Sequence, residues 1–162
     1  MPFKIWVDAD ALPSEIKEII LRAALRLGIE TTLVANKTLW VGENPLISFV
    51  RVEKGPDVAD SYIVEASKPE DFCITADIPL AALLVDKGLT VIDPRGELYS
   101  EGIIGERLSV RHFMAGLRES GVMTGGPAPF SPKVKQKFAS VFDSLLTKAI
   151  RKDRDSPTNR VS

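Results

Sequence analysis

Short apolar runs alternate with amphipathic stretches over the first hundred residues. Residues 3–7 form an apolar run that predicts a β-strand ending at Asp8. The following segment, 12–27, carries apolar residues at helical spacing, which predicts a helix with one buried face. Gly28 stands where a C-cap glycine would end that helix. The apolar positions of the predicted helix are Ile16, Ile19, Ile20, Ala23, Ala24 and Leu27.

The same alternation continues and predicts the class of fold. Further strands are expected at 31–35, 47–52, 71–75 and 89–92, with a short helix opening at 57–60 and another at 80–87. A βαββαβαβ order with nearly continuous apolar strands is typical of a mostly parallel sheet covered on both faces. We therefore expect an α/β protein built as a three-layer α/β/α sandwich.

After Tyr99 the pattern becomes helical. Helices are predicted over about 103–108, 109–120 and 132–152, the last with an apolar stripe that must dock on the body of the protein. At 162 residues the chain has the length of one domain. We expect a single domain over 1–152 that includes the C-terminal helices, and a disordered tail at 153–162.

Composition narrows the possible chemistry. No apolar stretch approaches the ~18 residues that a membrane span needs, and no signal-peptide pattern opens the chain, so a cytoplasmic protein without membrane contact is expected. The single cysteine, Cys73, and the single histidine, His112, leave no internal disulfide and no zinc cluster. Any chemistry must therefore rest on carboxylates, hydroxyls and basic groups.

The net charge of −1 conceals an asymmetry along the chain. Residues 1–100 contain 10 Lys/Arg and 16 Asp/Glu, whereas residues 132–162 contain 8 and 3. An acidic body with a basic end indicates an anionic partner. Much of the basic end lies on a helix whose other face must pack, so we treat it as an accessory to the acidic region.

Five aspartates fall where the predicted strands end or the following helices begin. Because the carboxyl ends of parallel strands share one edge of the sheet, these side chains are expected to lie close together. Carboxylates gathered in this way repel one another unless a cation neutralises them, and Mg²⁺ and Mn²⁺ prefer oxygen ligands. The residues are Asp8, Asp10, Asp57, Asp60 and Asp77, of which Asp8, Asp10, Asp60 and Asp77 are the predicted metal ligands.

Helix capping is the plainer explanation for some of these residues. Asp is a preferred N-cap, and Asp10, Asp57 and Asp77 each stand where a helix is expected to begin. Capping does not explain why Asp8 precedes Asp10 or why Asp60 follows Asp57.

Three further polar residues at the same edge are candidates for substrate binding: Asn36, Thr75 and Arg95. Arg95 could bind a phosphate through two parallel hydrogen bonds, or could belong to an ordinary turn. The apolar segment Leu39-Trp40-Val41 is a candidate contact for a homodimer.

Seven short motifs stand out along the chain: IWVDADALP (5–13), LVAN (33–36), GPDVAD (55–60), ITADIPLA (74–81), DPRGELY (93–99), RLSVR (107–111) and SGVMTGGP (120–127). In this order, over roughly residues 3–150, they resemble the YaiI/YqxD family of bacterial proteins. The family usually has Cys at the position of Leu12. The family looks like a PIN-like nuclease domain related to the NYN ribonucleases. This resemblance implies a metal-dependent ribonuclease that cleaves RNA with Mg²⁺ or Mn²⁺, with all five aspartates at its catalytic positions.

Two other functions fit parts of the sequence. The Asp8-x-Asp10 motif after a strand resembles the nucleophile motif of haloacid-dehalogenase-type phosphatases, in which Asp8 would form a phospho-aspartate. The expected later Lys and paired acids do not follow at suitable spacing. Alternatively, the domain binds RNA or a protein without catalysis, and its acids hold a structural cation.

Overall fold

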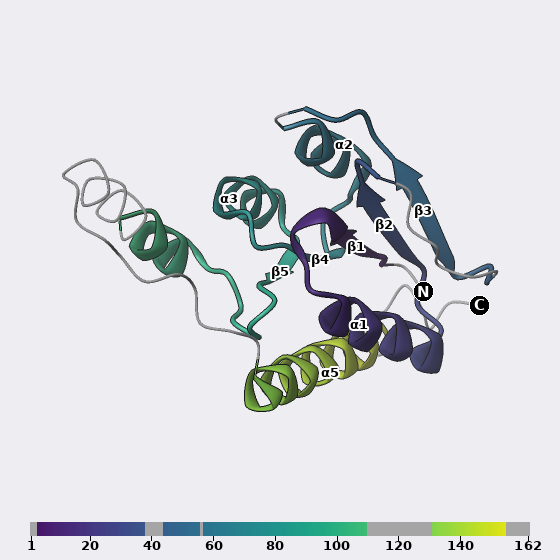
Figure 1. Ribbon diagram of the computed structural model, residues 1–162. Coiled ribbons are helices and arrows are strands. Elements are labelled where there is room, and N and C mark those ends of the chain that lie inside the picture. The colour runs from purple at the N-terminus through teal and green to yellow at the C-terminus, as the bar shows by residue number, and fades with distance from the viewer. Residues whose placement is uncertain (1–2, 38–43, 56, 110–130, 155–162) are drawn as a thin grey trace.

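The fold is described by a computed structural model that covers residues 3–37, 44–55, 57–109 and 131–154. Trp40, His112 and the Leu39-Trp40-Val41 segment lie outside these described residues. Five strands form one sheet, with helices between strands and after the last strand (Figure 1). The strands are β1 (Ile5–Asp8), β2 (Thr31–Ala35), β3 (Ile47–Arg51), β4 (Phe72–Ile74) and β5 (Thr90–Ile92).

All strand pairs are parallel, in the order β3-β2-β1-β4-β5. The chain therefore leaves the sheet at one edge after β3 and returns beside β1 as β4. The strand order reverses between β1 and β4, and the carboxyl ends of two such strands border the crevice where ligands bind in open α/β sheets. Asp8 ends β1 at this crevice, and Thr75 follows β4.

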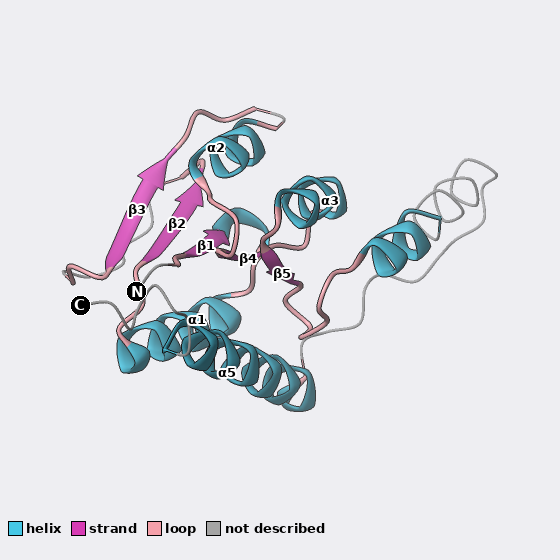
Figure 2. Cartoon of the chain, turned by 180° about the vertical axis from the view of Figure 1, so that it is seen from behind, coloured by secondary structure: helices cyan, strands magenta, loops and turns pink. Residues whose placement is uncertain are grey.

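Helices cover both faces of the sheet, so the predicted three-layer α/β/α architecture is confirmed. Seen from the front and from behind, α1 and α5 lie together on one face, whereas α2 and α3 cover the other (Figures 1 and 2). The bounds are α1 (Ser14–Leu27), α2 (Val58–Ala66), α3 (Ile78–Lys87) and α5 (Pro132–Arg154), and residues 101–109 are helical as well. None of the described helices combines the length and apolar character that crossing a membrane requires.

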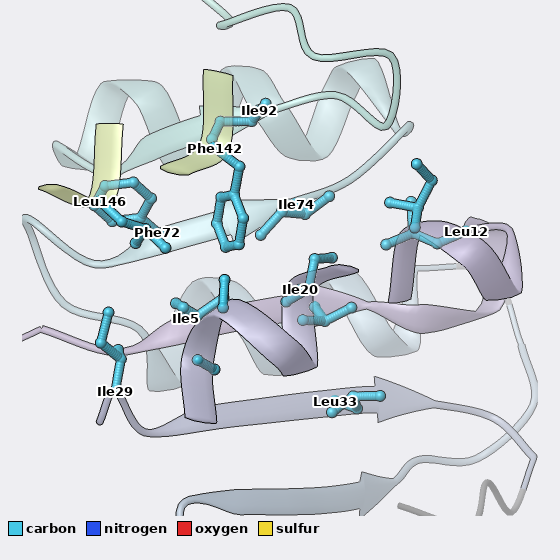
Figure 3. Packing of buried hydrophobic residues seen from close by; sticks show 14 of the residues in the cluster. Ile5, Leu12, Ile20, Ile29, Leu33, Phe72, Ile74, Ile92, Phe142 and Leu146 are labelled. Carbon is cyan, nitrogen blue, oxygen red and sulfur yellow. The ribbon is translucent and has the colours of Figure 1, made fainter. Parts of the chain in front are cut away.

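The strand alternation sorts buried residues into two cores. On β1, Ile5 and Val7 face α1 and α5, while Trp6 faces α2 and α3. On β4, Phe72 and Ile74 join the first core and Cys73 the second. Figure 3 shows Phe142 and Leu146 of α5 packed beside Phe72 and Ile74 in the first core. By the same period-2 rule, Asp8 faces the side of α2 and α3.

Several helices differ from their predicted bounds, among them α3, which begins at Ile78 rather than at residue 80. A short 3-10 helix, η1 (Ala9–Ala11), follows β1, so α1 begins at Ser14 with Pro13 at its N-cap rather than near Leu12. This turn changes the direction of the chain within three residues and places Asp10 beside the end of β2. At the other terminus, α5 continues to Arg154 rather than ending at Lys152.

Candidate active site at the carboxyl edge of the sheet

Asp8 and Asp77 are joined through one hydroxyl at the crevice between β1 and β4. The Oγ1 atom of Thr75 donates a hydrogen bond of 2.8 Å to Oδ2 of Asp8 and accepts one of 3.0 Å from the backbone N–H of Asp77. Thr75 is fully buried and Asp8 is 6% exposed. The hydroxyl therefore holds the end of β1 and the start of α3 at a set separation.

Asp77 combines two roles that the sequence left as alternatives. Its Oδ1 atom accepts a hydrogen bond of 3.0 Å from the backbone N–H of Leu80, so the side chain caps α3 as predicted. The same carboxyl also lies close enough to Asp60, on the first turn of α2, to raise the pKa of Asp60. Capping thus does not remove Asp77 from the acidic cluster.

Mutual repulsion marks the cluster. Burial raises the pKa of Asp60 to about 6, and the carboxylates of Asp77, Asp8 and Asp57 add to that rise. The pKa of Asp8 is raised as well, chiefly by burial and then by Asp77 and Asp10, although the Thr75 hydrogen bond opposes the rise. Within the described residues, every charge that shifts these two groups is a carboxylate. Such a site favours a proton or a cation.

Asp10 and Asp57 lie at the rim of the cluster. Oδ2 of Asp10 accepts a hydrogen bond of 2.8 Å from the backbone N–H of Asn36, which ties η1 to the end of β2. Asp57 precedes α2 with a left-handed backbone (φ 63°), and its side chain makes no capping hydrogen bond. The predicted capping roles of Asp10 and Asp57 are therefore wrong, whereas that of Asp77 is confirmed.

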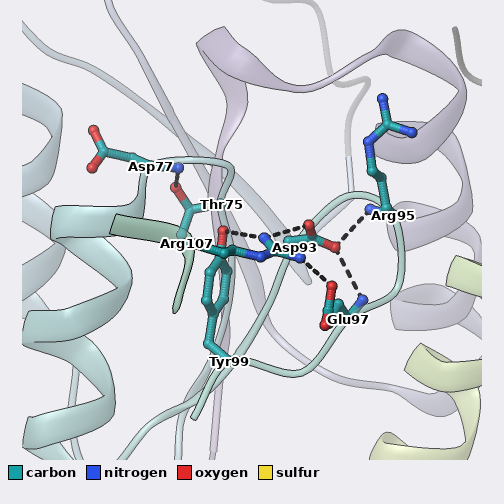
Figure 4. Close-up of polar contacts among 7 residues, drawn as sticks. All are labelled: Thr75, Asp77, Asp93, Arg95, Glu97, Tyr99 and Arg107. Atoms are coloured by element: carbon teal, nitrogen blue, oxygen red, sulfur yellow. Dashed lines mark hydrogen bonds and ion pairs between the residues drawn. The ribbon is translucent and has the colours of Figure 1, made fainter. Parts of the chain in front are cut away.

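A second buried aspartate, Asp93, organises the loop after β5. Its Oδ1 accepts the backbone N–H groups of Arg95 (2.9 Å) and Glu97 (3.0 Å), and its Oδ2 accepts Nη1 of Arg107 at 2.7 Å (Figure 4). Arg107 also donates to the Glu97 carboxylate and to the hydroxyl of Tyr99, and its guanidinium carbon lies 5.1 Å from the Tyr99 ring centre. This carboxylate, unlike the cluster, is neutralised.

A cavity of about 460 Å³ joins the two regions. It shares Asp10 with the acidic cluster, and its walls include Ala76 and Ile78, the neighbours of Asp77. The far wall is the loop after β5 with the helix that follows it. That wall consists of Asp93, Pro94, Arg95, Tyr99 and Arg107.

Comparison with known proteins assigns the chain to a family. Residues 6–148 match the family described as "Uncharacterized BCR, YaiI/YqxD family". The chain belongs to the YaiI/YqxD family. A UPF0178 protein of Syntrophobacter fumaroxidans is 53% identical over 148 residues, covering 91% of this chain and 97% of that protein. Another from Trichlorobacter lovleyi is 54% identical over 147 residues, covering 91% and 96%. A third, from Geobacter sulfurreducens, is 51% identical over 150 residues, covering 92% and 99%. No solved structure matches the chain.

The YaiI/YqxD match spans all eight residues predicted at the site, and the structure places them unequally. Asp8, Asp60 and Asp77 interact directly, with Asp10 and Asp57 beside them. Thr75 lies inside the cluster as a bridge between aspartates. Asn36 approaches through its backbone N–H, which binds Asp10. Arg95 lies across the cavity from the cluster's edge, and its side chain extends away from Asp93 (Figure 4).

The donor set fits a hard divalent cation. The side chains that converge offer oxygen atoms, from the carboxylates and from the Thr75 hydroxyl. Mg²⁺ is commonly held by one or two carboxylates, with waters and substrate phosphates completing the octahedron. Asp60 and Asp77, which are close enough for Asp77 to raise the pKa of Asp60, would provide that pair. Within residues 3–37, 44–55, 57–109 and 131–154, no group of three or more His, Cys, Asp or Glu is arranged to ligate one ion together.

Sequence reasoning missed Arg107. Its local sequence shows an arginine on a helix, and nothing there indicates that it neutralises a buried carboxylate 14 positions earlier. Asp93 carried a weak signal, because an Asp-Pro-Arg-Gly sequence indicates a turn whose first side chain binds backbone N–H groups two residues on. That Arg107 lies beside Asp93 depends on the tertiary packing of residues 101–109, which the local sequence does not show.

Proposed function

We propose that this chain is a divalent-metal-dependent nuclease that cleaves RNA phosphodiesters at the carboxyl edge of its sheet. The observation that supports it best is the cluster of Asp8, Asp60 and Asp77, whose like charges act on one another at the point where the strand order reverses. The choice of RNA follows from the resemblance of the sequence to PIN-like ribonucleases. Perturbed carboxylates in a crevice are typical of functional sites.

Each residue of the cluster has a part in the proposed reaction. Asp60 and Asp77 would hold the cation, and Asp8, which Thr75 fixes in place, would orient an attacking water or a further ligand. Asp10, held by the backbone of Asn36, faces the cavity and would position the substrate phosphate through bound water. A bound Mg²⁺ or Mn²⁺ ion supplies charge stabilisation for the phosphoryl oxygens and a water of lowered pKa.

The test compares cleavage of an end-labelled single-stranded RNA by the wild type and by isosteric variants, in Mn²⁺ and in Mg²⁺. Asp8→Asn and Asp77→Asn remove one charge each, and Asn can still accept the hydrogen bonds from Thr75 or Leu80. We expect cleavage by the wild type and a loss of at least about a hundredfold in each variant, since both remove charge at the reacting phosphate.

Asp86→Asn is the matched control, because Asp86 is an exposed aspartate near the other end of α3. It should cleave like the wild type. Absence of cleavage by the wild type, or full activity in Asp8→Asn and Asp77→Asn, would contradict the proposal. A single-stranded DNA of the same sequence tests the choice of RNA.

A further inference from the structure

The cavity beside the acidic cluster has the size and lining of a ligand site. Its volume of about 460 Å³ lies within the range of roughly 300–1,000 Å³ that is usual for small-molecule pockets. Leu12, Pro13, Ile78 and Pro94 give it apolar walls. Its charged groups are Asp10, Asp93, Arg95 and Arg107, of which Arg107 is paired with Asp93 and Glu97. An apolar chamber with arginines at one wall suits a flat, partly polar group attached to a phosphate.

The arginine wall is rigid. Asp93 fixes the backbone of the turn through the N–H groups of Arg95 and Glu97, and it holds Arg107 from the neighbouring helix. Gly96 has φ 87°, and a Cβ atom there would lie 2.9 Å from the Cα of Phe138, so the turn lies directly against α5. The wall is therefore preorganised, which lowers the entropic cost of binding.

The first turns of α5 extend this wall with positive charge. The backbone of Lys137 touches the turn at Gly96, and Lys133 lies one helical turn before it. Both lysines are exposed. The Lys137 backbone lies beside Gly96, the residue after Arg95, so these lysines add positive charge near the turn. Several cations in one region suit a polyanion better than a small phosphate ester.

We propose that this cavity holds one nucleoside of a single-stranded nucleic acid, with Arg95 on an adjoining phosphate and the strand continuing over Lys133 and Lys137. The proposal rests on the proposed function, in that the acidic cluster is taken as the position of the phosphate to be cleaved. Asp10, Ala76 and Ile78 border both the cluster and the cavity, so a phosphate at the cluster places its neighbouring nucleoside in the cavity.

The concave shape selects against duplexes. A paired base faces its partner and stacks on its neighbours, so it enters a cavity only after it is flipped out, which costs the free energy of unpairing and unstacking. An unpaired base pays little of that cost and can stack on a guanidinium plane. Arg107 has such a plane, held in place by Asp93 and Glu97.

The test measures binding rather than cleavage. A fluorescent, phosphorothioate-linked single strand of about ten nucleotides, within the size range of single-strand sites, is titrated in Mg²⁺ and followed by anisotropy. Arg95→Ala should weaken binding about tenfold, because a charge-assisted contact to phosphate is lost. Arg22→Ala, which removes an exposed arginine on α1, should bind like the wild type. The matching duplex should bind at least about tenfold more weakly than the single strand.

A cavity-filling variant tests the nucleoside site without changing any charge. Ala76 is exposed on the cavity wall, and Ala76→Phe should lower the affinity for the single strand about tenfold, the effect of losing one stacked base. An abasic residue at the position of the seated nucleoside should lower the wild-type affinity equally and should have no further effect on Ala76→Phe. Lys137→Ala should reduce the slope of log affinity against log salt by about 0.7.

Equal binding by Arg95→Ala and the wild type, with unchanged melting curves, would overturn this inference, as would equal affinity for the duplex or full affinity of Ala76→Phe. Its failure is distinguishable from that of the nuclease proposal. Cleavage together with Arg95-independent binding rejects the binding site alone. Arg95-dependent binding by a protein that never cleaves rejects the nuclease and keeps the binding site.

Discussion

The amino and carboxyl edges of the parallel sheet carry buried aspartates with opposite surroundings. At the amino end, Asp71 is 3% exposed and accepts three hydrogen bonds of 2.9 Å, from the backbone N–H groups of Lys4 and Lys68 and from the indole N–H of Trp6. At the carboxyl end, Asp8 is 6% exposed, accepts one hydrogen bond from Thr75 and lies among other carboxylates. The same sheet thus stabilises the buried charge of Asp71 with hydrogen-bond donors and surrounds the buried charge of Asp8 with other carboxylates.

The difference separates structural acids from candidate functional acids. A buried carboxylate that serves the fold is surrounded by donors, because leaving it unpaired costs several kcal/mol. Asp71 follows this rule, and so does Asp93 with its arginine. Asp8 and Asp60 do not follow this rule, because other carboxylates lie close to them. The resulting repulsion between carboxylates is found at the crevice where the strand order reverses. Residues that destabilise the fold at a crevice are the ones we expect to act on a ligand.

The largest expected effect on stability is that of removing Asp71, at the amino edge of the sheet. Asp71→Ala leaves three donors without an acceptor and should lower the free energy of unfolding by about 3 kcal/mol, measured by urea denaturation. Asp8→Asn, at the other end of the sheet, should leave stability in metal-free buffer unchanged or higher, because a repelled charge is removed. Equal losses in the two variants would contradict the distinction between the two ends.

Removing the partner of Asp93 should produce a smaller loss. Arg107→Ala leaves a buried carboxylate with its two backbone donors only, so we expect a decrease of about 2 kcal/mol in the free energy of unfolding. Asp93→Asn in the same background should recover part of that loss, which a double-mutant cycle measures. Additive effects of the two substitutions would show that the ion pair contributes nothing.

A divalent cation should stabilise the carboxyl end. With Mn²⁺ at ten times its dissociation constant, the melting temperature of the wild type should rise by about 4 °C, because the ion binds only the folded state. Asp60→Asn and Asp77→Asn should lose most of that rise. Asp71→Asn should show the same rise, measured from its own melting temperature without metal. An equal shift in all four proteins would place the cation elsewhere.

The smallest effect is a pH dependence. Because the pKa of Asp60 rises from 3.8 in the unfolded chain to about 6 in the folded protein, the folded state binds more protons between these values. In metal-free buffer the free energy of unfolding should therefore fall as the pH rises from about 4 to about 6. Asp60→Asn should flatten this slope, and Asp86→Asn should not. A slope unchanged in Asp60→Asn would contradict the raised pKa of Asp60.

Much of the fold follows from the sequence because its signals are local. Apolar runs of strand length and the helical spacing of Ile16, Ile20 and Ala24 reflect burial directly, and all five strands form where these patterns place them. The turn at Ala9–Ala11 escaped prediction because three residues carry no periodicity. The order of the strands also comes from packing, since nothing in the pattern states that β4 pairs with β1.

The site was predictable as far as strand ends determine it. Parallel strands align their carboxyl ends, so grouping Asp8 with Asp77 needed only the strand assignments. The bridging position of Thr75 and the convergence of Asp60 from α2 depend on tertiary packing. The neutralisation of Asp71 and Asp93 likewise depends on donors far away in the chain, such as Trp6 and Arg107.

The central claim is that the carboxylates at the carboxyl edge form a binding site for a divalent cation. Titration of the purified protein with Mn²⁺, followed by electron paramagnetic resonance of the free ion, tests this most directly. We predict saturable binding by the wild type and by Asp71→Asn, and a loss of at least about tenfold in affinity in Asp60→Asn and Asp77→Asn. No saturable binding by the wild type, or equal binding by all four proteins, would contradict the account.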